Sequence, residues 1–231
     1  MKNRRGDVAW GLVLLIWILI LTIPSTRTQF INYTNIHPYI GGFVKFAILA
    51  TMGDLLGARI LKSEWNIPKG LIFRAILWGV LGMMITLIFT IFVSGVSAAQ
   101  SMGMLPFAGS ILAQAFFASA AMNVTFGPML YIYHKFGDLF IDSCYEKKGQ
   151  KILIKDMVDK VDWYTMVSFS WLKTCLLIWI PLHTIVFLLP TQYRVLASAF
   201  LSILLGILVA LSKKLIIKNK KEKEEILCHL K

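Results

Sequence analysis

The sequence predicts an all-α fold: a polytopic bundle of about six transmembrane helices that forms a single domain over residues 1–231. Composition is the first observation behind this prediction, because 57% of residues are hydrophobic and only 16% are charged. The mean hydropathy of +0.70 points the same way. A water-soluble domain rarely sustains such values, so the chain is expected in a lipid bilayer.

Long apolar runs are the second observation, because a bilayer core of about 30 Å needs roughly 20 helical residues. The predicted spans cover residues 8–23, 39–61, 71–96, 107–133, 165–189 and 195–212. The first run follows Lys2, Arg4 and Arg5 and also resembles a signal peptide. No small-x-small cleavage motif follows it, so we expect it to remain as a span.

The distribution of Lys and Arg is the third observation, and it orients the spans. Three precede the first span, four lie in the 59–74 turn, six in the 134–164 loop and seven in the 213–231 tail, whereas the opposite connections hold two, Arg27 and Arg194. Cytoplasmic flanks of membrane proteins are enriched in these residues. The loop, the tail and both termini are therefore predicted to be cytoplasmic, in a multi-pass protein of a bacterial-type cell membrane.

The net charge of +12 identifies the expected partners. Basic residues lie at the ends of apolar runs and not on an aromatic-interleaved face, so we expect anionic lipid headgroups and the bilayer as partners, and no nucleic acid. A homo-oligomer or another membrane protein remains an open alternative. The 134–164 loop is predicted to contain a short amphipathic helix with these apolar residues: Ile152, Ile154, Met157, Val158 and Val161.

Polar side chains inside spans are the candidate pathway or polar-core residues, because each is costly in lipid unless it is paired or faces water. They are Lys45, Asp54, Arg74, Gln114, Asn123, Lys173 and His183. Depths counted along straight helices predict two levels, which are Lys45, Gln114 and His183 at one, and Asp54, Asn123 and Lys173 at the other.

Each of these residues has a structural interpretation beside the functional one. Asp54 either lines a pathway or pairs with Arg74 or Lys173 on a neighbouring helix. His183 either contacts a solute or satisfies a hydrogen bond in the packed interior. Lys45 and Lys173 are expected to snorkel towards the interfaces.

Motifs of soluble enzymes and metal sites are missing from the sequence. It contains no phosphate loop, GxSxG or HExxH pattern, and its four histidines lack metal-ligand spacing. We therefore expect no enzymatic activity, no catalytic residue, no metal and no cofactor. The Gly53-x-x-x-Gly57 pattern predicts close helix packing, and Pro128 and Pro181 predict bends within spans.

Short motifs along the chain resemble those of the Mpv-seventeen and peroxisomal-membrane-protein family. Residues 127–138 resemble its glycine-proline, aromatic and leucine-aspartate signature, and residues 179–195 its tryptophan-proline and proline-x-x-tyrosine-arginine ending. The matching positions are Gly53, Asp54, Gly127, Pro128, Trp179, Pro181, Pro190, Tyr193 and Arg194. The chain differs from the family by an extra residue between Trp179 and Pro181 and by His183 in place of a glutamine. The resemblance implies an integral membrane protein that forms a channel for small solutes.

Two functions follow as expectations. The first is a channel-like or facilitator pathway for a small-molecule solute. The second is a non-conducting structural or partner-binding membrane subunit, such as the substrate-binding component of an energy-coupled transporter, which would dock its partner through the 134–164 loop.

Overall fold

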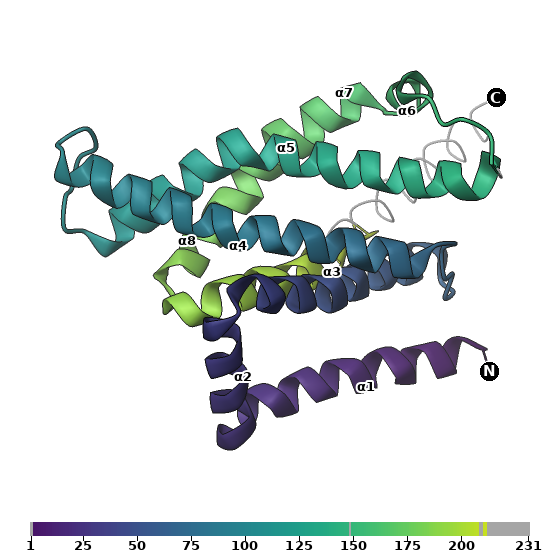
Figure 1. The fold of residues 1–231 in the computed structure, drawn as a ribbon, viewed down its shortest axis with the longest axis horizontal. Coiled ribbons are helices and arrows are strands. Elements are labelled where there is room, and N and C mark those ends of the chain that lie inside the picture. Colours follow the sequence, from purple (N-terminus) through teal and green to yellow (C-terminus); the bar gives the residue numbers. More distant parts are fainter. Residues whose placement is uncertain (1, 148, 208–209, 212–231) are drawn as a thin grey trace, which may run out of the picture.

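Helices make up every regular element of the computed structural model, which describes residues 2–147, 149–207 and 210–211 (Figure 1). In chain order they are α1 (Lys2–Thr22), α2 (Pro24–Ile36), α3 (Pro38–Lys62), α4 (Leu71–Ser101), α5 (Ile111–Lys147), α6 (Ile154–Asp159), α7 (Trp163–Thr165), the π-helix η1 (Met166–Trp179), α8 (Ile180–Leu188) and a last helix, Thr191–Ile207. The predicted all-α fold class is confirmed.

Helices of sufficient length and hydropathy make this chain a multi-pass membrane protein. Within the described residues, five segments are long and apolar enough to cross a membrane: Arg4–Thr22, Pro38–Lys62, Leu71–Ser101, Ile111–Lys147 and Trp163–Leu188. Thr191–Ile207 is a shorter apolar helix. It overlaps the predicted span 195–212, whose end lies outside the described residues, as does the predicted tail 213–231.

The bounds of α5 differ most from the sequence prediction. The helix begins at Ile111 and not at residue 107, because Phe107 and Gly109 adopt positive φ angles of 60° and 85° in a turn. It then continues to Lys147, so the prediction of a loop was wrong for residues 134–147. The mean hydropathy falls there because the segment contains charged residues. Two of them, Asp138 and Asp142, pair with Arg74 on α4, and hydropathy does not report such pairs.

A helix also occupies a connection that the sequence analysis left unassigned, residues 24–38. Pro24 and Pro38 each lie in the first turn of a helix, where the missing N–H costs no hydrogen bond. Figure 1 shows that α2 runs nearly perpendicular to α1 and α3 and joins them at one end of the bundle.

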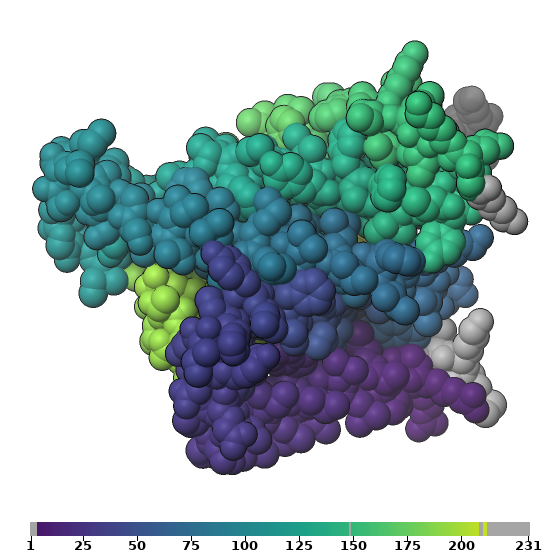
Figure 2. Space-filling model, in the orientation of Figure 1, coloured from purple at the N-terminus to yellow at the C-terminus, as the bar shows by residue number. Residues whose placement is uncertain are grey.

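The connections between helices fall at two opposite ends of the bundle. The Lys2 end of α1, the turn between α3 and α4, and α6 lie at one end, whereas α2 and the turn between α4 and α5 lie at the other (Figure 1). The described connections that are rich in Lys and Arg therefore lie at the same end of the bundle, as their Lys and Arg content predicts. Figure 2 shows that the α4–α5 end projects beyond its neighbours.

The main core lies between α3, α4, α5, α8 and the last helix, around Phe46, Leu49, Ala118 and Ala199. Glycines let two of these helices touch. A Cβ at Gly53 would lie 2.6 Å from the carbonyl oxygen of Ser202, and one at Gly57 would lie 3.1 Å from that of Gly206. Both glycines of the predicted packing motif therefore face the last helix.

The predicted amphipathic helix of the 134–164 connection corresponds to α6, which is six residues long. Met157 of α6 and Val161 just beyond it pack against Leu139 and Met166, whereas Ile154 at the start of α6 is exposed. The next helical segment begins at Asp162, whose carboxylate accepts a hydrogen bond of 3.0 Å from the Thr165 N–H. Hydrogen bonding from the Thr165 side chain, and then from this N–H, holds the pKa of Asp162 below its usual range.

Candidate functional site

The interior of the bundle contains a cavity of about 430 Å³, here called the central cavity. Helices α3, α4, α5, η1, α8 and the last helix all contribute to its wall. The polar lining residues are Asp54, Asn123, Tyr131, His134, His183, Ser198 and Ser202, and the aromatic ones are Phe46, Trp78, Phe89, Phe126, Tyr131 and Trp179. The wall is thus mainly apolar and aromatic, with polar groups gathered in two places.

The first polar place is centred on His183, which is 8% exposed. Its Nδ1 lies 3.1 Å from Asn123 Nδ2, and its Nε2 lies 3.3 Å from Ser198 Oγ. The ring stacks on Trp179, with ring centroids 5.0 Å apart. Asn123 also donates to the Ser119 carbonyl oxygen at 2.9 Å. A neutral imidazole that accepts at Nδ1 from Asn123 Nδ2 donates from Nε2 to Ser198 Oγ. The other tautomer donates from Nδ1 to Asn123 Oδ1, 3.3 Å away, and accepts from the Ser198 hydroxyl.

This contact corrects the two predicted levels, which placed His183 and Asn123 apart. Depths were counted from the ends of the predicted spans, and those ends do not lie in common planes. The depth of Asn123 was counted from residue 133, whereas α5 continues to Lys147. Gln114, predicted beside His183, instead donates to the Val93 carbonyl oxygen at 3.5 Å.

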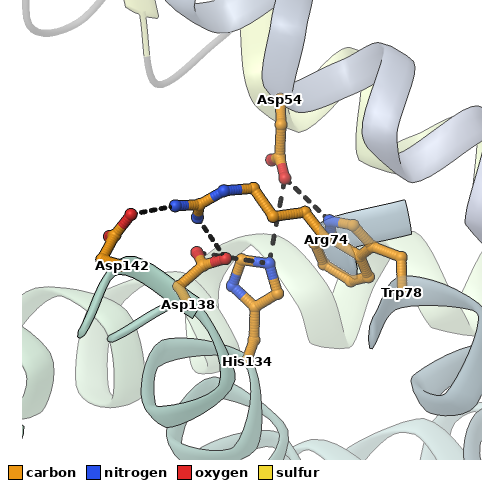
Figure 3. Close-up of polar contacts among 6 residues, drawn as sticks. All are labelled: Asp54, Arg74, Trp78, His134, Asp138 and Asp142. Atoms are coloured by element: carbon orange, nitrogen blue, oxygen red, sulfur yellow. Dashed lines mark hydrogen bonds and ion pairs between the residues drawn. The ribbon is translucent and has the colours of Figure 1, made fainter. Parts of the chain in front are cut away.

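The second polar place is a group of charged residues at the other end of the cavity, here called the Arg74 cluster: Asp54, Arg74, Trp78, His134, Asp138 and Asp142 (Figure 3). Arg74, 16% exposed, donates to Asp138 at 2.5 Å and also to Asp142. The His134 Nε2 lies 3.8 Å from carboxylate oxygens of both Asp54 and Asp138. The cluster thus brings three carboxyl groups together with one guanidinium, which pairs with two of them.

Asp54 belongs both to this cluster and to the cavity wall. Its carboxylate accepts a hydrogen bond of 2.7 Å from Trp78 Nε1, yet 56% of its side chain is accessible because it faces the cavity. The predicted ion pair of Asp54 with Arg74 or Lys173 is absent from the described residues. Arg74 is instead paired with Asp138 and Asp142, and Lys173 is exposed on η1.

His134, Asp138 and Asp142 were missed by the sequence analysis. Their spacing of four residues places them on one helix face, which is the signal that would have found them. It was not used because residues 134–164 were interpreted as a loop. Trp78 and Ser198 were also missed, and their residue types alone carry no such signal in an apolar segment.

A second cavity of about 430 Å³ lies at the opposite end of the bundle and is here called the Lys45 pocket. Its lining residues are Thr34, Asn35, Pro38, Lys45, Thr86, Phe89, Thr90, Val93, Ser94, Thr191, Gln192, Arg194 and Val195. Lys45 is 4% exposed, so the prediction that it snorkels to the interface was wrong. Its ammonium lies 5.2 Å from the centre of the Phe30 ring.

Phe89 lines both cavities, so its side chain lies where they adjoin. The ring is 5% exposed and makes edge-to-face contacts with His183 and Phe187, at centroid distances of 5.6 Å and 4.9 Å. Phe89 is therefore the residue that the linings of the two cavities share.

The residues matched to the family motifs have mainly packing and backbone contacts. Trp179 donates to the Tyr131 hydroxyl at 2.9 Å, and Arg194 donates from Nε to the Leu189 carbonyl oxygen at 2.9 Å. A Cβ at Gly127 would lie 2.9 Å from the Cys175 Sγ. The remaining positions are Pro128 inside α5, Pro181 in the first turn of α8, and Pro190, whose carbonyl accepts from the Tyr193 N–H.

Within the part of the chain that the structure describes, no group of three His, Cys, Asp or Glu side chains is arranged to hold a metal ion. No protein-family model, curated protein or solved structure matches the chain. The geometry of the two cavities is therefore the basis for a functional proposal.

Proposed function

We propose that this membrane protein provides a facilitator pathway for small solutes, formed by the Lys45 pocket and the central cavity in series. The observation that carries the proposal is that two cavities of similar size, at opposite ends of the bundle, share Phe89 as a lining residue. The predicted candidates Lys45, Asp54, Asn123 and His183 line one cavity or the other.

The charge on Asp54 supports this proposal. A carboxylate within a membrane span is retained where it pairs or faces water. Asp54 has a tryptophan donor and a histidine 3.8 Å away, but more than half of its side chain remains accessible from the cavity. A carboxylate in this position fits a hydrated pathway better than a packed interior.

The proposal also includes four expectations from the sequence. It includes a cell-membrane location, cytoplasmic termini, the absence of catalysis and membership of the Mpv-seventeen and peroxisomal-membrane-protein family. With that orientation, the Lys45 pocket opens outward and the Arg74 cluster forms the cytoplasmic end.

The alternative of a non-conducting partner-binding subunit finds less support. It relied on an amphipathic docking helix in the 134–164 connection. Two apolar side chains of that connection, Met157 and Val161, are buried against Leu139 and Met166 and are not available to a partner. Exposed apolar residues of the same connection keep this alternative open: Leu153 at 47%, Ile154 at 71% and Tyr164 at 82%.

The test is solute flux and bilayer conductance of the purified chain in liposomes. Phe89→Leu removes part of the ring between the cavities and should raise flux severalfold, whereas Phe89→Trp should lower it. Phe116→Leu on α5 is the matched control, because that side chain is 47% exposed on the bundle surface. Folded variants whose flux equals that of the unaltered chain would contradict the pathway. Stable co-purification of an ATPase, without flux, would favour the alternative.

A further inference from the structure

Lys45 is a buried cation without a counter-ion. Its side chain is 4% exposed, and it has no hydrogen bond or ion pair with any described residue. The aromatic ring of Phe30, 5.2 Å from the ammonium, is its one recorded electrostatic contact. A single cation–π contact offsets only part of the cost of removing an ammonium from water.

Among the described residues, no carboxylate lines the pocket around this lysine. Its sequence contains no Asp or Glu between Asp7 and Asp54, between Glu64 and Asp138, or between Asp162 and Glu222. All of the helix segments that line the Lys45 pocket fall inside those three stretches. Lys45 therefore has no carboxylate partner within the described residues, and a ligand can supply the negative charge.

A second cation faces the same pocket. Arg194 uses Nε to hold the Leu189 carbonyl oxygen, and among the described residues its two terminal nitrogens have no recorded partner. Two further side-chain amides, on Asn35 and Gln192, line the pocket without recorded hydrogen bonds. The hydroxyls of Thr86 and Thr90 donate to carbonyls of their own helix. The donors free to meet a ligand among the described residues are thus one ammonium, one guanidinium, two amides and the hydroxyls of Ser94 and Thr191.

We infer that the Lys45 pocket is a binding site for a phosphate group. A phosphate group accepts several hydrogen bonds at once, and its oxygens match the fork of donors that a guanidinium presents. One lysine and one arginine supply two positive charges, which balance a phosphate dianion. The cavity of about 430 Å³ also leaves room for whatever the phosphate is attached to. The site does not depend on the proposed pathway, because it requires binding and not passage.

The phosphate could belong to a soluble ion or ester, or to a lipid headgroup, and the two sources are separated by two arms of one experiment. In the first arm, the full-length chain in neutral detergent is titrated with inorganic phosphate, and binding is followed by thermal stabilisation and by broadening of the phosphate ³¹P resonance. In the second, the chain is placed in phosphatidylcholine nanodiscs with or without phosphatidylglycerol, and retained lipid is measured by native mass spectrometry.

The expected result is saturable binding in at least one arm, weakened tenfold or more by Lys45→Met and by Arg194→Met and preserved in Lys45→Arg. Lys173→Met is the matched control, because that lysine lies in another span and is exposed. It should leave binding unchanged. If Lys45→Met fails to fold, Lys45→Arg and Arg194→Met still decide the matter. Absence of binding in both arms, or equal binding by the unaltered chain and Arg194→Met, would overturn the inference.

Discussion

Two regions of this protein place a basic side chain inside a membrane span and treat its charge in opposite ways. In the Arg74 cluster, the guanidinium contacts two carboxylates of the same chain, Asp138 and Asp142. In the Lys45 pocket, the ammonium is more deeply buried and meets an aromatic ring instead.

The two regions differ in the source of the counter-ion, which is the chain itself in one and a ligand in the other. Where the chain provides its own carboxylates, the cation joins α4 to α5 and contributes to stability. Where it provides none, the cation is left for a ligand. The comparison can be tested because the two regions should respond differently when charges are removed.

The largest effect is expected for Arg74→Met. Removing one partner of a buried ion pair costs about 3–5 kcal/mol, and the partial exposure of Asp142, 45% of its side chain, reduces this to roughly 2–3 kcal/mol. The measurement is the free energy of unfolding in mixed micelles. Lys69→Met, at an exposed position in the turn before α4, is the control and should change stability by less than about 0.5 kcal/mol. A similarly small change for Arg74→Met would show that the Arg74 cluster does not stabilise the fold.

A smaller effect is expected for Asp138→Asn. Arg74 keeps Asp142 and loses one charged acceptor, so the free energy of unfolding should fall by about 1–2 kcal/mol. Asp159→Asn in α6 is the control, because that residue is exposed. In the double variant with Arg74→Met the two losses should not add, since both remove the same interaction. Strict additivity would show that the two side chains act independently.

Asp54→Asn should separate function from stability. The amide oxygen can still accept from Trp78 Nε1, and the side chain already faces the cavity, so stability should change by less than about 1 kcal/mol. Solute flux in liposomes should nevertheless change severalfold, because the charge on the cavity wall is lost. If the variant has unchanged flux and a large loss of stability, Asp54 stabilises the fold, as Arg74 does, and does not act on the solute.

The smallest effect on stability is expected for Lys45→Met without phosphate. The ammonium has no acceptor among the described residues, so its removal should leave the free energy of unfolding unchanged or raise it slightly. Thermal unfolding in phosphate-free buffer measures this, with Lys173→Met as the comparison. A loss of more than about 2 kcal/mol would mean that Lys45 has a structural partner and that the two regions are alike.

Part of the candidate site could be predicted from sequence. Asp54, Asn123 and His183 were selected as polar residues within apolar runs, and all three line the central cavity. The same argument also selected Gln114 and Lys173, which do not, because polarity within a span does not report the direction of a side chain. His134 and Asp138 escaped selection because their segment was interpreted as a loop.

The sequence by itself determined the all-α membrane class and the approximate position of five of the six predicted spans, because transfer into lipid depends on the summed hydropathy of a local run. It also determined that no acidic residue lies between Asp7 and Asp54, the stretch that contains Lys45. Only the tertiary structure decided that His183 meets Asn123, that Arg74 pairs with Asp138 and Asp142, and that Phe89 lies between two cavities. Those contacts depend on how helices are rotated, staggered and lengthened against one another, and side-chain packing between distant segments sets that arrangement.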